Sequence, residues 1–114
     1  MRLKSGIFAS ALIRRANGAG GFAAVRHRGA EEAGAVFVKV ATLDGHAALY
    51  GPALPSLSAG ADTGDRLFEV LLPPDTPEPA VEERMAKEIR FDPDLWFVEI
   101  EDREGRHFLE LARG

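Results

Sequence analysis

The segment KEIRFDPDLWFVEIEDREGRHF, residues 87–108, carries the strongest structural signals in the chain. It contains the end of a predicted helix, an Asp-Pro-Asp stop and an alternating strand over Leu95–Glu101 that includes the only tryptophan, Trp96. Alternation of apolar and polar residues is typical of a strand. A turn with glycine then leads to a last predicted strand over Arg106–Leu111. The segment therefore predicts a helix, a strand and a return strand in succession, and it holds no recognisable catalytic motif.

The residues before this segment predict a charged helix over Thr76–Arg90. Thr76 is a suitable N-cap, and a proline follows at the first helical position, where its missing N–H is tolerated. Val81, Met85 and Ile89 form a narrow apolar stripe. A stripe of this width indicates a helix that lies on the surface of a sheet.

Another helix is predicted near the start of the chain, over Ser5–Asn17. At ~100° per residue, its apolar side chains, among them Ile7, Leu12 and Ile13, spread over most of the circumference. Such a helix needs cover on more than one side. We expect either the rest of the fold or a second subunit to supply that cover.

Three strand-like runs follow the first helix, and we expect them to form an antiparallel meander. Asp44-Gly45 between the second and third runs is a strong hairpin signal. Gly51–Asp65 is rich in Gly, Pro and Ser and forms a long loop, which is either a lid or a plain connection. The four strands predicted before the second helix are Phe22–Arg28, Ala35–Leu43, His46–Tyr50 and Arg66–Leu72.

Length and composition bound the class of protein. The 114 residues suit one domain, residues 1–114, and 46 % apolar with 28 % charged residues is a globular balance. The absence of cysteine excludes disulfides, thiolate metal sites and cysteine nucleophiles. No run approaches the ~20 apolar residues that cross a bilayer. Arg14-Arg15 stands where a signal peptide would need a small-residue cleavage site, so we expect a cytoplasmic protein with no membrane partner.

Charge is unevenly distributed along the chain. Residues 1–40 carry seven Lys or Arg and two acidic residues, whereas residues 41–114 carry seven Lys or Arg and sixteen acidic residues. This asymmetry indicates either an anionic partner for the basic half or two halves that pack together and neutralise each other.

Four arginines are the first candidate binding residues. Arg26 and Arg28 share one face of a predicted strand, and Arg14 and Arg15 lie on the preceding helix. Together they would form a basic surface for single-stranded nucleic acid or for the ribosome. Alternatively, the strand arginines face the acidic C-terminal hairpin across the sheet, because a half-buried arginine needs such partners.

Asp92, Asp94 and His107 are the second set of candidates. With Arg15 they could form the site of a small enzyme or ligand sensor beneath the 51–65 loop, since carboxylates and an imidazole suit acid–base chemistry. The competing interpretation is turn chemistry, in which short acidic side chains accept backbone N–H groups. The sequence shows no metal-binding or cofactor motif, and we expect neither a metal nor a cofactor.

Three long segments together are similar to a known family. They are RLKSGIFASALIRRANGAGGFAAVRHRG at residues 2–29, GAVFVKVATLDGHAALYGPA at residues 34–53 and EIRFDPDLWFVEIEDREGRHFL at residues 88–109. They resemble Domain of Unknown Function family 1491, which consists of small, single-domain, mostly alphaproteobacterial proteins. The resemblance implies a soluble bacterial protein without an assigned activity, and it supplies no catalytic or binding residue.

These patterns predict an α+β fold of two layers, with two helices and a mostly antiparallel sheet of about five or six strands, in the order α-β-β-β-β-α-β-β. The favoured function is a non-catalytic binding or adaptor module, whose partner is another protein or a second copy in a homodimer. Nucleic-acid binding and a small enzyme or sensor are the alternatives. The predicted core contains Ile7, Phe8, Leu12, Val25, Val36, Val38, Val40, Leu49, Phe68, Val70, Met85, Ile89, Trp96, Val98 and Ile100.

Overall fold

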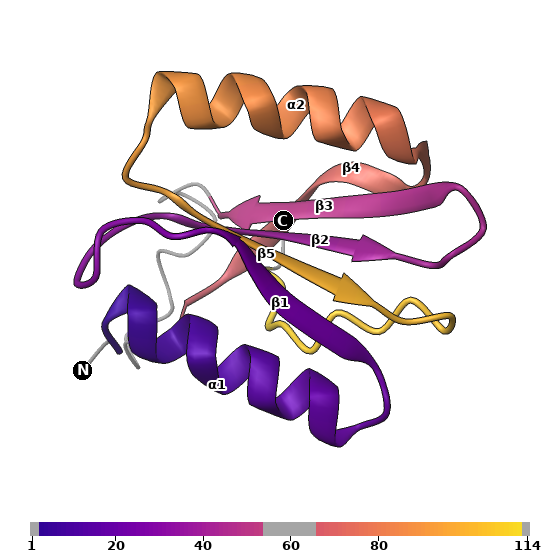
Figure 1. Ribbon diagram of the computed structural model, residues 1–114, viewed down its shortest axis with the longest axis horizontal. Helices are drawn as coiled ribbons and strands as arrows, with labels where there is room; N and C mark the ends of the chain where they lie inside the picture. Colours follow the sequence, from indigo (N-terminus) through magenta and orange to yellow (C-terminus); the bar gives the residue numbers. More distant parts are fainter. Residues whose placement is uncertain (1–2, 54–65, 113–114) are drawn as a thin grey trace.

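A five-stranded sheet lies between two helices in the computed structural model, which describes residues 3–53 and 66–112 (Figure 1). Helix α1 covers one face of the sheet and helix α2 covers the other. The elements in chain order are α1 (Ser5–Gly18), β1 (Phe22–His27), β2 (Val36–Ala41), β3 (His46–Pro52), β4 (Phe68–Pro77), α2 (Glu78–Phe91) and β5 (Trp96–Glu101).

The sheet has the strand order β1-β5-β2-β3-β4. The central pair β2–β5 is parallel, and the other neighbouring pairs are antiparallel. The α+β class and the mostly antiparallel sheet are therefore confirmed. The β2–β3 hairpin also forms as predicted, because Asp44 Oδ1 accepts hydrogen bonds from Thr42 Oγ1 at 2.6 Å and from the His46 N–H at 3.1 Å.

The predicted meander is wrong at its first connection, because β5 is inserted between β1 and β2. The segment between β1 and β2 is hydrogen-bonded to the start of β5. The Ala30 N–H donates to Asp94 O at 2.8 Å, and the Trp96 ring N–H donates to Ala30 O at 2.7 Å. A Cβ on Gly29 or Gly34 would overlap the Asp94 carbonyl oxygen, so glycine permits this close approach.

The two-layer arrangement is also wrong, since the helices lie on opposite faces and the protein has three layers (Figure 1). Leu12 and Ala16 of α1 pack on one face, and Val81 and Met85 of α2 pack on the other. The cause lies in the central strands, whose side chains are mostly apolar on both faces of the sheet. All six residues of β2 are buried, and a sheet that is apolar on both faces needs cover on both.

Three residues of the predicted core are exposed. Ile7, Val25 and Val70 have exposed fractions of 53 %, 38 % and 47 %. Val25 and Val70 belong to β1 and β4, the two edge strands, each of which has a neighbouring strand on one side only. Ile7 lies on the side of α1 opposite the buried Leu12, and therefore points away from the sheet.

The boundary between β4 and α2 differs from the prediction. Strand β4 continues through two prolines to Pro77, which an edge strand tolerates because its outer N–H groups need no partner. Helix α2 therefore begins at Glu78. Thr76 does not cap it, since its hydroxyl donates to Pro73 O at 2.7 Å.

The predicted strand over Arg106–Leu111 is reduced to a single parallel bridge between Leu111 and Phe68. Most of the predicted loop Gly51–Asp65 lies outside the described residues, from position 54 onward. Neither helix of the described part is long and apolar enough to cross a bilayer.

Candidate functional site

A bulge in β1 separates two of the predicted arginines. The register between β1 and β5 shifts at Arg26. As a result, the Arg26 guanidinium lies 5.0 Å from the centre of the Phe97 ring, on the α2 side, and the Arg28 guanidinium lies 5.1 Å from the Trp96 ring, which belongs to the α1 side. The prediction that Arg26 and Arg28 share a face is therefore wrong.

The outer side of α1 carries the other two arginines. Arg14 and Arg15 are exposed, and the side chain of neither makes a hydrogen bond or ion pair with another described residue. Ile7, which lies on the same side of the helix as Arg14, is 53 % exposed, and Leu3, two residues before the helix begins, is 51 % exposed. Helix α1 thus presents an outer face, defined here by Leu3, Ile7, Arg14 and Arg15, that is apolar at one end and cationic at the other.

Asp92 and Asp94 lie in the turn before β5. Asp92 Oδ1 accepts the Asp94 N–H at 3.1 Å, and Asp92 O accepts the Leu95 N–H at 3.2 Å. These contacts fit the turn-chemistry interpretation. Among the described residues, no hydrogen bond or ion pair joins either carboxylate to Arg15 or His107.

His107 follows the other end of β5 and packs on Tyr50, with ring centres 4.9 Å apart. Its Nδ1 accepts the Leu109 N–H at 2.9 Å. Partial burial lowers the pKa of His107 below its usual value. No described contact brings His107 to Asp92 or Asp94, so an acid–base site shared by the three stays a prediction.

Lys39 is the centre of a charge cluster that was not predicted from the sequence. The residue lies in the middle of β2, with 2 % of its side chain exposed. Its Nζ is 2.7 Å from Glu78 Oε2, 2.5 Å from Glu82 Oε2 and 3.3 Å from Glu99 Oε2. Glu78 and Glu82 are one turn apart on α2, so both reach the same ammonium group. A buried ammonium group needs such partners.

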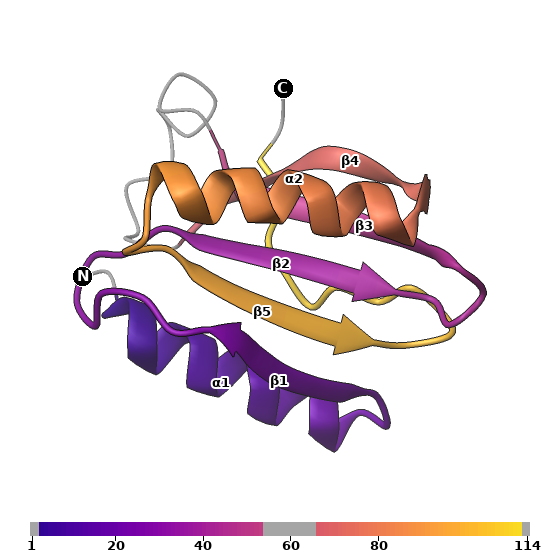
Figure 2. The same cartoon turned by 45° about the horizontal axis from the view of Figure 1, so that its top comes forward.

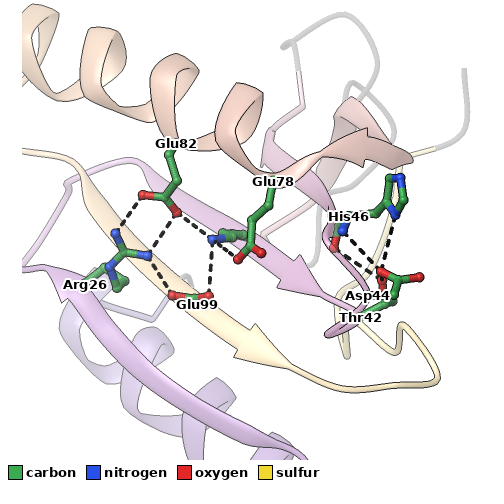
Figure 3. A network of polar contacts seen from close by, with 8 residues as sticks. Arg26, Thr42, Asp44, His46, Glu78, Glu82 and Glu99 are labelled. Carbon is green, nitrogen blue, oxygen red and sulfur yellow. Dashed lines mark hydrogen bonds and ion pairs between the residues drawn. The ribbon is translucent and has the colours of Figure 1, made fainter.

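Arg26 extends this cluster to β1. Its two terminal nitrogens lie 2.8 and 3.1 Å from the two carboxylate oxygens of Glu82, and Nη1 also lies 2.6 Å from Glu99 Oε1 (Figure 3). The Lys39 cluster, defined as Arg26, Lys39, Glu78, Glu82 and Glu99, therefore links α2 to three strands. It also neutralises Arg26, which is not free to contact a phosphate.

The cluster fixes the protonation of its members. Hydrogen bonds from Arg26 and Lys39 outweigh burial and lower the pKa of Glu82 to about 2. Burial by itself would lower the pKa of Lys39, but its hydrogen bonds to Glu78 and Glu82 raise that pKa above the usual value. Lys39 is therefore an ammonium ion at neutral pH, a state in which it neither attacks a carbonyl nor accepts a proton.

The chemistry that the cluster offers is charge pairing. Within the described residues, no group of three or more His, Asp or Glu side chains is arranged to hold a metal ion. The one signal in the sequence is Lys39 itself, a charged residue inside the β-branched run of Ala35–Leu43. That run predicts burial on both faces, which would demand counter-ions for the lysine.

Comparison with known proteins identifies structural relatives but no activity. A crystal structure of a DUF1491 family protein from Caulobacter crescentus is 38 % identical, covers 100 % of both chains and has a TM-score of 0.81. A solution structure of a protein from A. tumefaciens is 46 % identical, with 100 % of this chain and 98 % of that chain covered and a TM-score of 0.83. No curated protein matches the chain.

The family model described as a protein of unknown function, DUF1491, matches residues 3–110. This range includes both helices, all five strands and the Lys39 cluster. The chain therefore belongs to the DUF1491 family.

Proposed function

We propose that this protein is a non-catalytic binding module that engages an acidic surface of a protein partner through the outer face of α1. The observation that carries the proposal is the exposure of Leu3 and Ile7, at 51 % and 53 %, beside two arginines without a described partner. Exposed apolar side chains bordered by charge are typical of protein interaction sites.

Charge determines the kind of partner. The first turn of α1 contains no acidic residue, and its last turn contains Arg15. A parallel two-fold contact between two α1 helices would bring Arg14 and Arg15 close to their own copies, and like charges oppose such a contact. An antiparallel two-fold contact would place these arginines against Leu3 and Ile7, which offer no carboxylate. The outer face therefore favours a different surface, one that offers carboxylates and some apolar area.

Nucleic-acid binding has less support. Of the four predicted arginines, Arg26 is neutralised by Glu82 and Glu99, and Arg28 stacks on Trp96. Arg14, Arg15 and Arg28 remain for phosphates, and so few cations give weak, salt-dependent binding. The bacterial sources of the relatives support a bacterial origin, and we retain the cytoplasm as the proposed location.

Selection from a random library of displayed peptides on the immobilised protein tests the proposal. We expect enrichment of acidic peptides with regularly spaced apolar residues. Their binding should weaken at least about tenfold in Ile7→Asp, the loss of one central apolar contact. An aspartate in the first turn suits the positive end of a helix, so this variant should fold.

Phe91→Ser is the matched control, because Phe91 is 90 % exposed at the end of α2 and lies outside the outer face of α1. It should bind the selected peptides as the wild type does. Selection of peptides whose binding is equal in wild type and Ile7→Asp would contradict the proposal. Tight, salt-dependent binding of an oligouridylate in place of peptides would favour the nucleic-acid alternative.

A further inference from the structure

Helix α2 leaves part of its sheet face uncovered. It packs on β3 and β4, while β5 and β1 extend beyond it on the same face (Figure 2). Ala24 pairs with Glu99 in this sheet, and Phe22 pairs with Glu101. We call these α2-facing residues of β1 and β5, together with Arg26, the open strip.

Two hollows include residues of the open strip in their walls. The first has a volume of about 600 Å³ and is lined by the Lys39 cluster and Pro79. The second, of about 370 Å³, is bounded by Phe22, Leu43 and Glu101 and by the turn after β5. Phe22 and Leu43 are 60 % and 46 % exposed, so the second hollow offers apolar contact area.

Both hollows carry an excess of negative charge. The first has three carboxylates against the cations Arg26 and Lys39. In the second, the bidentate pair of Asp102 and Arg106, with 2.7 and 3.0 Å contacts, neutralises itself. The other charged groups of this hollow are Glu101, Glu104 and Arg103, so its carboxylates exceed its cations by one. The open strip thus offers both an excess of carboxylates and exposed apolar area, which the outer face of α1 requires of a partner.

We propose that the open strip is the docking surface for the outer face of α1 of a second copy of this chain. This inference rests on the proposed function and names the partner. Arg14 and Arg15 of one copy meet the excess carboxylates of the next, and Leu3 and Ile7 meet the apolar area around Phe22.

Dimensions and orientation support this pairing. A helix of 14 residues, the length of α1, is ~21 Å long, and a strand of six residues, the length of β5, is ~20 Å long. The outer face of α1 and the open strip lie on opposite sides of the sheet (Figure 1). The two surfaces of one copy therefore point in opposite directions, which gives a head-to-tail contact that does not close and so extends into a chain.

Analytical ultracentrifugation with two complementary variants tests the inference. The wild-type mass should rise above the 12.3 kDa monomer as concentration increases, and high salt should reverse the rise. Ile7→Asp, which damages the outer face, and Phe22→Ala with Glu101→Lys, which damages the open strip, should each remain monomeric. Phe91→Ala, a matched loss of an exposed aromatic ring outside both surfaces, should associate as the wild type does.

Mixing the two damaged proteins gives the decisive result. Each retains the surface that the other has lost, so an equimolar mixture should form a dimer of twice the monomer mass that grows no further. A mixture that stays monomeric under conditions where the wild type associates overturns the inference. A wild type that stays monomeric throughout overturns it as well, while selected acidic peptides that still depend on Ile7 would leave the proposed function intact.

Discussion

The two helices are attached to the sheet by different kinds of contact. Helix α1 buries Ala9, Leu12 and Ala16 in the larger of the two cores, and its buried Ser5 hydroxyl donates to Gly34 O at 2.5 Å. These contacts are apolar or uncharged. Helix α2 fully buries only Val81 and Met85, with Ile89 partly buried beside them, and it adds the ion pairs of Glu78 and Glu82.

The ionic attachment of α2 is concentrated near its N-terminus. Glu78 and Glu82 reach from the first turns of the helix to Lys39, and Glu82 also binds Arg26. Ion pairs depend on pH and salt, whereas apolar packing does not depend on protonation. The difference therefore predicts that α1 and α2 respond unequally to mutation, acid and salt.

The largest effect is expected on the α1 side, from Leu12→Ala. Leu12 is fully buried, and a Leu→Ala change at such a site costs about 3 kcal/mol through lost burial and the cavity left behind. The free energy of unfolding, measured by urea titration, should fall by this amount equally at low and high salt. Ile7→Ala on the exposed side is the control and should change stability by less than ~0.5 kcal/mol. A loss that depends on salt would contradict apolar attachment.

A smaller loss of stability, with a strong dependence on salt, is expected from Lys39→Met. The change keeps most of the volume but leaves three carboxylates facing one another without the ammonium ion. Removing one partner of a buried pair costs about 3–5 kcal/mol, and we expect about 2 kcal/mol because the glutamates are partly solvated. Adding Glu82→Gln and Glu99→Gln should recover part of the loss. If Lys39→Met were as stable as the wild type, apolar packing alone would hold α2.

Acid should weaken the attachment of α2 once the pH falls below 4.5. The pKa of Glu82 is lowered from 4.5 to about 2 in the folded protein. A depressed pKa means that its stabilisation is present above pH 4.5 and is lost as the pH falls toward 2. Glu82→Gln should lower the free energy of unfolding by about 1 kcal/mol at pH 7, the scale of a partly exposed ion pair. The difference in stability between this variant and the wild type should shrink as the pH falls from 4.5 toward 2. A constant difference would show that Glu82 does not act through its charge.

The sequence predicts contacts that are local and misses those that join distant segments. The bounds of α1, the β2–β3 hairpin and β5 follow from periodicity and turn residues within short windows, and the structure agrees closely with all three. The insertion of β5 between β1 and β2 cannot be predicted in this way, because it depends on the close approach of Gly29 and Gly34 to the Asp94 carbonyl group. Neither glycine differs from an ordinary turn glycine in the sequence.

The Lys39 cluster shows the same limit at the candidate site. Its members come from β1, β2, α2 and β5, and no two of them are close in sequence except Glu78 and Glu82. The position of Lys39 inside a β-branched run is a signal that it needs counter-ions, but nothing in the sequence identifies them among the many glutamates. The bulge at Arg26 is a further effect that strand alternation cannot predict, because it depends on pairing with β5.

The smallest expected effect concerns His107, on the α1 side. Burial lowers its pKa below 6.5, so its neutral form is favoured, and that form accepts the Leu109 N–H through Nδ1. Stability should therefore be complete above pH 6.5 and decline as the pH falls through the lower folded pKa. His107→Phe keeps the ring contact with Tyr50 but does not titrate, so its stability should be flat where the wild type declines. An NMR titration of the imidazole tests the cause directly. A midpoint at or above 6.5 would mean that burial does not control this group, and that acid does not weaken the α1 side through His107.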